Sequence, residues 1–169
     1  MVWLEHSLRT AVAAGASLVI ARLLHLPEAY WAAVTTLVVM QSTLGAAWKV
    51  STQRFIGTAL GAAIGALVGH HLGSGVLVLT VGVFGLGLIC GMLHLDQSAY
   101  RFAGVTFAIV TLVTRELAPI VVATHRFIEV SMGIAVALLI TALWPARYSR
   151  EASVEPMARL AADRPPAPN

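Results

Sequence analysis

A long uncharged stretch constrains this chain more than any other feature: the 39 residues from Phe55 to Leu93 carry no formal charge. A membrane-spanning helix needs about 20 predominantly apolar residues. The stretch is therefore long enough for two spans, and the segment His70–Gly75 predicts a turn between them. Only 11% of all residues are charged, against roughly 25% in soluble domains. The sequence thus predicts an all-α integral membrane protein.

Several functional classes are disfavoured. The net charge is +3, but the basic residues stand singly and form no basic run for nucleic acid. The single cysteine, Cys90, lies in an apolar run, can form no disulfide within the chain and has no metal-ligand spacing around it. No nucleophile–base pair, phosphate loop or nucleotide motif is present. We therefore expect no enzyme activity, no metal, no cofactor and no nucleic-acid partner.

Turn residues and charges divide the chain into six predicted spans. Pro27 separates the first pair, and Asp96 precedes the fifth. Ser51 or Thr52 is the expected N-cap of the third helix, and residues 115–126 are the longest expected connection. The spans are placed near residues 8–26, 29–48, 54–71, 75–95, 99–117 and 127–145.

The basic residues also predict an orientation, because Lys and Arg concentrate on the cytoplasmic side of a membrane. Both termini are expected in the cytoplasm, with a transmembrane domain over 1–145 in an inner membrane. Residues 146–169 lack periodic hydrophobicity and are expected to form a mobile cytoplasmic tail. This orientation places eight basic residues inside (Arg9, Lys49, Arg54, Arg101, Arg147, Arg150, Arg159 and Arg164) and three outside (Arg22, Arg115 and Arg126).

An internal repeat divides the spans into two units, near 1–72 and 73–145. Each unit holds three helices, and an odd number places the second unit upside down in the membrane. Inverted repeats build many transporters, with the substrate path near the interface of the units; the alternative is duplication that only made a symmetrical bundle. The matches are Leu24-His25-Leu26 with Leu93-His94-Leu95, Ala29-Tyr30 with Ala99-Tyr100, Ala33 and Thr36 with Ala103 and Thr106, and Arg54-Phe55-Ile56 and Gly61 with Arg126-Phe127-Ile128 and Gly133.

A glycine ladder runs along the third predicted helix. Gly57, Gly61, Gly65 and Gly69 are four residues apart and share one face. Small residues at this spacing let helix backbones approach closely in a membrane. The ladder therefore predicts a helix-packing or dimer face, with the smooth wall of a conduction path as the alternative.

Arg54 and Arg126 occupy matching positions at the starts of their predicted helices, and should lie at opposite mouths of the bundle. An arginine beside a helix N-terminus favours an anion, although each side chain alone could instead snorkel to lipid phosphates. Arg126 has Glu129 three residues on as an expected ion-pair partner, whereas the position after Arg54 is Gly57. Arg54 is therefore the better predicted anion contact.

Polar residues on the second and fifth predicted helices complete a predicted substrate path. Gln41, Thr36 and Thr106 are its candidates, beside the two arginines. Threonine hydroxyls often bond back to their own helix, so helix packing is the alternative role for each.

Two groups of residues form recognisable motifs, one in each predicted unit. They are Tyr30-Trp31-Ala32-Ala33 with Thr35, Val38, Val39, Gln41, Arg54, Gly57-Thr58 and Gly61, and Tyr100-Arg101-Phe102 with Arg126, Glu129, Gly133 and Trp144-Pro145. With them, the chain resembles the fusaric acid resistance and aromatic acid exporter family over residues 1 to about 150. The resemblance implies six helices with inside termini and export of aromatic carboxylates or related organic anions. Plant organic-anion channels that release malate, built as dimers, look like distant relatives.

The leading prediction is an efflux permease or channel subunit for organic anions in the lipid bilayer. Family members commonly carry a cytoplasmic domain after six helices and often a second membrane copy, whereas about 25 residues follow the last predicted helix here. The resemblance therefore implies a homodimer or a partner subunit. The alternative prediction is a non-transporting membrane scaffold that acts through its glycine-rich face. Coupled export and passive conduction both need the predicted path, and the sequence leaves both open.

Overall fold

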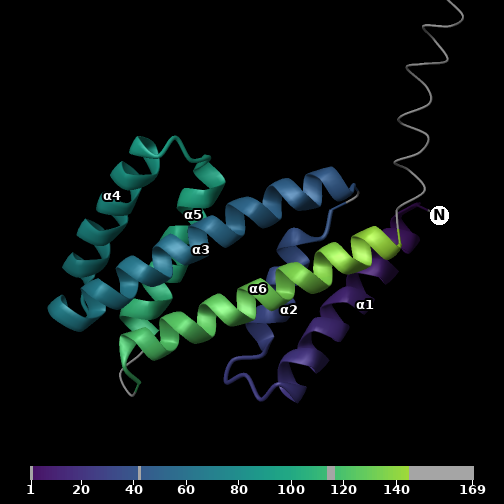
Figure 1. Cartoon of the computed structure of the whole chain (residues 1–169), viewed down its shortest axis with the longest axis horizontal. Coiled ribbons are helices and arrows are strands. Elements are labelled where there is room, and N and C mark those ends of the chain that lie inside the picture. The colour runs from purple at the N-terminus through teal and green to yellow at the C-terminus, as the bar shows by residue number, and fades with distance from the viewer. Residues whose placement is uncertain (1, 42, 114–116, 145–169) are drawn as a thin grey trace, which may run out of the picture.

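The computed structural model of the chain describes residues 2–41, 43–113 and 117–144 (Figure 1). The all-α prediction is confirmed for these ranges, whereas Arg115 and the predicted tail lie outside them. The elements are α1 (Val2–Leu23), α2 (Tyr30–Val39), α3 (Leu44–Leu72), α4 (Val76–Met92), α5 (Gln97–Ala108), the π-helical segment η1 (Ile109–Val113) and α6 (Pro119–Leu143).

Two long helices, α3 and α6, form the centre of the bundle. Figure 1 shows them side by side and antiparallel, and they are in extensive contact. Helices α4 and α5 lie on the side of α3, while α1 and α2 lie on the side of α6. Each long helix therefore packs against helices of the other predicted unit: α3 against α5, and α6 against α2.

Membrane-spanning dimensions are clear for only part of this bundle. By length and composition, α3 with 29 residues and α6 with 25 residues are long and apolar enough to cross a membrane. Helices α2 and α4 are apolar but shorter. At about 1.5 Å per residue, the 10 residues of α2 reach about 15 Å, or half of a hydrocarbon core of about 30 Å. The six predicted spans thus correspond to six helices, but α2 is too short to cross alone.

The predicted end of α2 and the predicted starts of α3 and α6 are wrong. The break between α2 and α3 lies at residues 40–43, and the N-cap is Thr43, whose Oγ1 accepts the Ala46 N–H at 3.2 Å. Ser51 and Thr52 lie inside α3. Helix α6 begins at Pro119, with proline in the first turn where its missing N–H costs nothing. Charged residues misled the prediction, because exposed or internally bonded charges stay within these helices.

Arg9 fixes the end of the bundle where α1 begins. Its side chain is 1% exposed, and its guanidinium donates to the carbonyls of Trp144, at 2.9 Å, and Gln41. These carbonyls follow the ends of α6 and α2, where unpaired carbonyls and the helix dipole favour a cation. The start of α1 and the end of α6 therefore lie at the same end of the bundle, whose cytoplasmic placement stays a prediction.

Matching positions of the predicted repeat share their local backbone. His25 and His94 have φ angles of 54° and 53°, a left-handed conformation that is uncommon outside glycine. Each lies in the same helix-ending turn, closed by Leu26 N–H to Ala21 C=O at 3.0 Å and by Leu95 N–H to Cys90 C=O at 2.9 Å. The second helix of each unit also loses α-helical geometry at matching positions, since α2 ends at Val39 and η1 begins at Ile109.

The glycine ladder faces the interior of the chain. A Cβ at Gly57 or Gly61 would overlap a carbonyl oxygen of α5, and at Gly65 or Gly69 it would press on η1 or the start of α6. Gly133 on α6 stands in the same relation to α2, where a Cβ would lie 2.5 Å from the Ala32 oxygen. The seam is therefore already covered by helices of this chain.

Gly61→Ala tests this packing. The added methyl has no room against the backbone of α5, so the free energy of unfolding should fall by about 1–3 kcal/mol. The matched control is Gly85→Ala in the middle of α4, where a Cβ would meet nothing within 4 Å. That control should unfold at least as late as the wild type in a denaturant titration in micelles. Equal stability of the two variants would contradict the seam.

Candidate functional site

Two buried arginines lie where α3 meets α6. Arg54 on α3 is 7% exposed and Arg126 on α6 is 3% exposed, so neither side chain snorkels to lipid in this structure. Both are well inside their helices, and the rings of Phe55 and Phe127, the next residue in each case, have centroids 5.1 Å apart. The predicted placement at helix starts and opposite mouths is therefore wrong. The arginines lie inside the bundle because their guanidinium groups bond to neighbouring segments there, Arg54 to Thr35 of α2 and Arg126 to Glu28.

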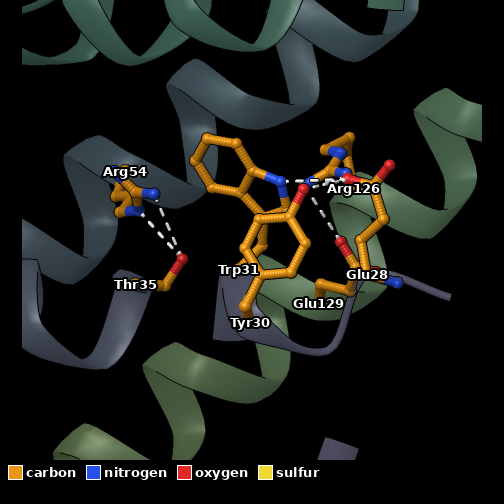
Figure 2. Close-up of polar contacts among 7 residues, drawn as sticks. All are labelled: Glu28, Tyr30, Trp31, Thr35, Arg54, Arg126 and Glu129. Atoms are coloured by element: carbon orange, nitrogen blue, oxygen red, sulfur yellow. Dashed lines mark hydrogen bonds and ion pairs between the residues drawn. The ribbon is translucent and has the colours of Figure 1, made fainter. Parts of the chain in front are cut away.

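Arg126 is held by two carboxylates (Figure 2). Its guanidinium forms close ion pairs with Glu28, in the α1–α2 connection, and with Glu129, at 3.2 Å from Nη1. The predicted Arg126–Glu129 pair is confirmed. The Oε2 atom of Glu28 also accepts the Tyr30 hydroxyl and the Trp31 indole N–H, each at 3.0 Å, while the Glu28 N–H donates to Glu129 Oε1 at 3.0 Å.

Arg54 has a different environment. Its Nε and Nη2 donate to the hydroxyl of Thr35 on α2, at 3.3 Å and 3.1 Å. Among the residues that the structure describes, no carboxylate forms an ion pair with it. The difference follows from the sequence, because the position of Glu129 on α6 corresponds to Gly57 on α3, where α5 fills the space.

An aromatic ring lies beneath each guanidinium. The Arg126 Cζ is 4.7 Å from the centroid of Trp31, and the Arg54 Cζ is 4.8 Å from that of Phe102. Both rings belong to the second helix of the opposite predicted unit, 71 residues apart, while the arginines are 72 apart. Figure 2 shows the side chain of Trp31 between the two arginines in that view. A cation over an aromatic face gains roughly 0.5–2 kcal/mol.

Electrostatics make Arg54 the unusual member of this pair. A charge removed from water is costly unless it is paired and hydrogen-bonded. One hydroxyl and one ring face compensate only part of that cost, and ionisable groups at membrane depth are expensive for the same reason. No group of three His, Cys, Asp or Glu side chains gathers as metal ligands within the described ranges. Of the two arginines, Arg54 is the one without a carboxylate partner among the described residues.

The other predicted path residues use their polar atoms within or between helices. Thr36 is buried and donates to the carbonyls of Ala32 and Gly133, at 3.0 Å and 3.1 Å. Thr106 donates to Phe102 C=O at 3.0 Å, and the Gln41 amide donates to Val38 C=O at 3.4 Å. The structure therefore places Arg54 and Arg126 on side chains one helical turn apart on α2, Thr35 and Trp31. It leaves Thr36, Thr106 and Gln41 in bonds to backbone carbonyls.

Surface grooves lie away from the arginines. A groove of about 630 Å³ runs between the start of α3 and the end of α6, past Trp48 and Leu139. A polar one of about 400 Å³ lies near Ser74 and Thr111. Neither is lined by Arg54 or Arg126, nor are the grooves of about 290 Å³ beside Cys90 and about 440 Å³ beside His70. The guanidinium groups are covered by protein in this conformation.

Sequence reasoning missed the roles of Glu28, Trp31, Thr35 and Phe102 in this site. Glu28 follows Pro27 in the connection between the first two predicted helices, and no local pattern ties it to Arg126, 98 positions away. The aromatic pair was accessible in principle, because Trp31 and Phe102 obey nearly the same offset as the two arginines. Only contacts across the two units show that these rings lie under the guanidinium groups.

The fold and the buried charges define a helical membrane protein with an arginine site between its central helices. The profile of the fusaric acid resistance protein-like family matches residues 14–140, and the chain belongs to this family. It is 32% identical over 146 residues to inner membrane protein YeeA of Escherichia coli (strain K12), covering 84% of this chain. The chain spans 41% of the length of that relative. No solved structure matches the chain.

Arg126→Gln and Arg54→Gln form a matched test of the asymmetry. Removing Arg126 leaves the fully buried Glu129 without its cation, so stability should fall by about 3–5 kcal/mol. Removing Arg54 deletes an unpaired charge and one hydroxyl contact, so it should change stability by no more than about 1 kcal/mol. Denaturant titration in micelles measures both. Adding Glu129→Gln to Arg126→Gln should restore part of the loss, and failure to do so would contradict the pairing.

Proposed function

We propose that this chain is the membrane-embedded part of a transport protein for organic anions, with aromatic carboxylates as the leading substrate class. Arg54 is the proposed anion contact, and Thr35 and Phe102 are its neighbours. Membership of the family and the inner-membrane relative support a function in membrane transport. The substrate class rests on the site itself.

The observation that carries this proposal is the contrast between the two arginines. At Arg126, the carboxylate of Glu28 is bound by a guanidinium, a phenol hydroxyl and an indole N–H beside an aromatic ring. Arg54 has the guanidinium and the ring but no carboxylate among the described residues. An external carboxylate would complete the second site in the way that Glu28 completes the first.

An inverted repeat gives such a site a way to open. Each long helix packs on the other unit, and Phe55 contacts its own repeat counterpart Phe127, as expected for residues beside a pseudo-two-fold axis. With three helices per unit, that axis would lie in the membrane plane, the arrangement in which one unit rocks against the other around a fixed site. The covered state of Arg54 would then be an occluded conformation.

Assembly is part of the same proposal. A homodimer or a partner subunit is expected to complete the transporter, with both termini in the cytoplasm. The contact would use a surface other than the Gly57–Gly69 seam, because α5, η1 and Pro119 already cover it. The same covering argues against a scaffold that docks partners through this face.

Flux through proteoliposomes tests the proposed substrate class. The wild type should carry benzoate and larger aromatic carboxylates but not the matching neutral amides. Arg54→Gln should reduce carboxylate flux at least about tenfold, since one lost charged hydrogen bond is worth roughly 1.5–3 kcal/mol. Arg54→Lys should keep part of it, because the charge remains.

The matched control is Arg22→Gln, which removes an exposed arginine near the end of α1 and should leave flux unchanged. No flux with the wild type, or equal flux with Arg54→Gln, would refute the proposed anion contact.

A further inference from the structure

Two carboxylates share one arginine in the Arg126 site. Glu129 is 0% exposed, and within the described part of the chain its Oε2 has no hydrogen-bond partner beyond the ion-pair contact with Arg126. Glu28 is less buried, at 35% exposed, and its Oε2 receives the Arg126, Tyr30 and Trp31 donors. With both carboxylates ionised, Arg126, Glu28 and Glu129 sum to one negative charge, because one cation faces two anions.

The charged and titratable groups around this cluster determine its net charge. Glu28 and Tyr30 face the cluster from the α1–α2 connection and from α2, Arg126 belongs to α6, and His125 is its neighbour along that helix. Arg54 comes from α3 and bonds to Thr35, which lies one helical turn along α2 from the Trp31 ring that contacts Arg126. Arg54, Arg126, Glu28 and Glu129 together are neutral, and an anion at Arg54 would make this interior group negative.

We propose that the Glu28–Glu129 pair takes up one proton when a carboxylate binds at Arg54, so that anion and proton bind cooperatively. The inference rests on the proposed anion site and adds its coupling ion. The proton comes from water and forms an O–H bond on Glu129 Oε2 in place of its ion pair with Arg126, while Arg126 stays paired with Glu28. Uptake restores neutrality at a site where an uncompensated charge is costly.

Glu129 is the proton acceptor in this proposal because its hydrogen bond does not require a negative charge. Its Oε1 accepts the Glu28 N–H, a bond that a carboxylic acid or an amide oxygen also makes. A metal ion is the less suitable counter-charge, because no third acidic, histidine or cysteine side chain joins the two carboxylates among the described residues.

Benzoate binding to the purified chain in weakly buffered micelles, followed with a pH-indicator dye, tests the coupling. At neutral pH the wild type should take up one proton per benzoate bound, and its affinity should fall about tenfold per pH unit above neutrality, as linkage of one proton requires. Glu129→Gln mimics the protonated acid, so it should bind with the low-pH affinity of the wild type at every pH and take up no proton. Asp96→Asn, which removes an exposed carboxylate, should keep the wild-type uptake.

Glu28→Gln is a second, independent variant, because it leaves one carboxylate for one arginine and should also abolish the uptake. Uptake that persists in both variants, pH-independent binding by the wild type, or a dependence on sodium or potassium in place of protons would overturn the coupling and leave the anion site standing. Absence of benzoate binding at any pH, or binding that Arg54→Gln does not weaken, would instead overturn the proposed function.

Discussion

Close backbone contact at glycine holds the centre of this protein together. Lipid tails are as apolar as leucine, so helices in a membrane gain little from apolar contact alone and depend on tight packing. Gly57 and Gly61 let α3 approach the carbonyls of α5, and Gly133 lets α6 approach those of α2. These contacts bring the second helix of each unit under the arginine of the other, and so create the buried site.

The two halves of the site have the same frame but different charges. Each arginine stacks on an aromatic ring of the opposite unit, yet only Arg126 has carboxylate partners among the described residues. The difference comes from one position of the predicted repeat, where α3 has Gly57 and α6 has Glu129. In the proposed function, an external carboxylate takes the place beside Arg54 that Glu28 has beside Arg126.

Membership of the fusaric acid resistance protein-like family agrees with this arrangement, and the site adds physical content to it. The chain spans less than half of the length of the relative from Escherichia coli, and the proteoliposome flux measurement tests whether this part transports organic anions. The buried guanidinium of Arg54, without a carboxylate partner among the described residues, supports the proposed anion site, and the second carboxylate beside Arg126 supports the proposed proton coupling.

Much of the framework was predictable from the sequence. The long uncharged stretch predicted two helices with a turn at His70–Gly75 between them. In the structure α3 ends at Leu72 and α4 begins at Val76. The repeat matched His25 with His94, and both occupy the same left-handed turn. The glycine ladder predicted close packing because its spacing is a property of one helix. Such features depend on neighbours along the chain, and the sequence contains them in full.

Tertiary structure alone decided which residues meet. Charge predicts helix ends at Lys49 and Arg54, but both residues lie inside α3. Lys49 is exposed at the surface of its helix, and the buried Arg54 bonds to Thr35. Glu28 joins Arg126 across 98 positions, and Arg9 joins Trp144 across 135. Partners of a buried charge can lie anywhere in the chain, because desolvation requires compensation but does not say from which helix it comes. The sequence by itself determined where helices form and which of their positions match, and the packing determined that Glu28 meets Arg126 and that Thr35 meets Arg54.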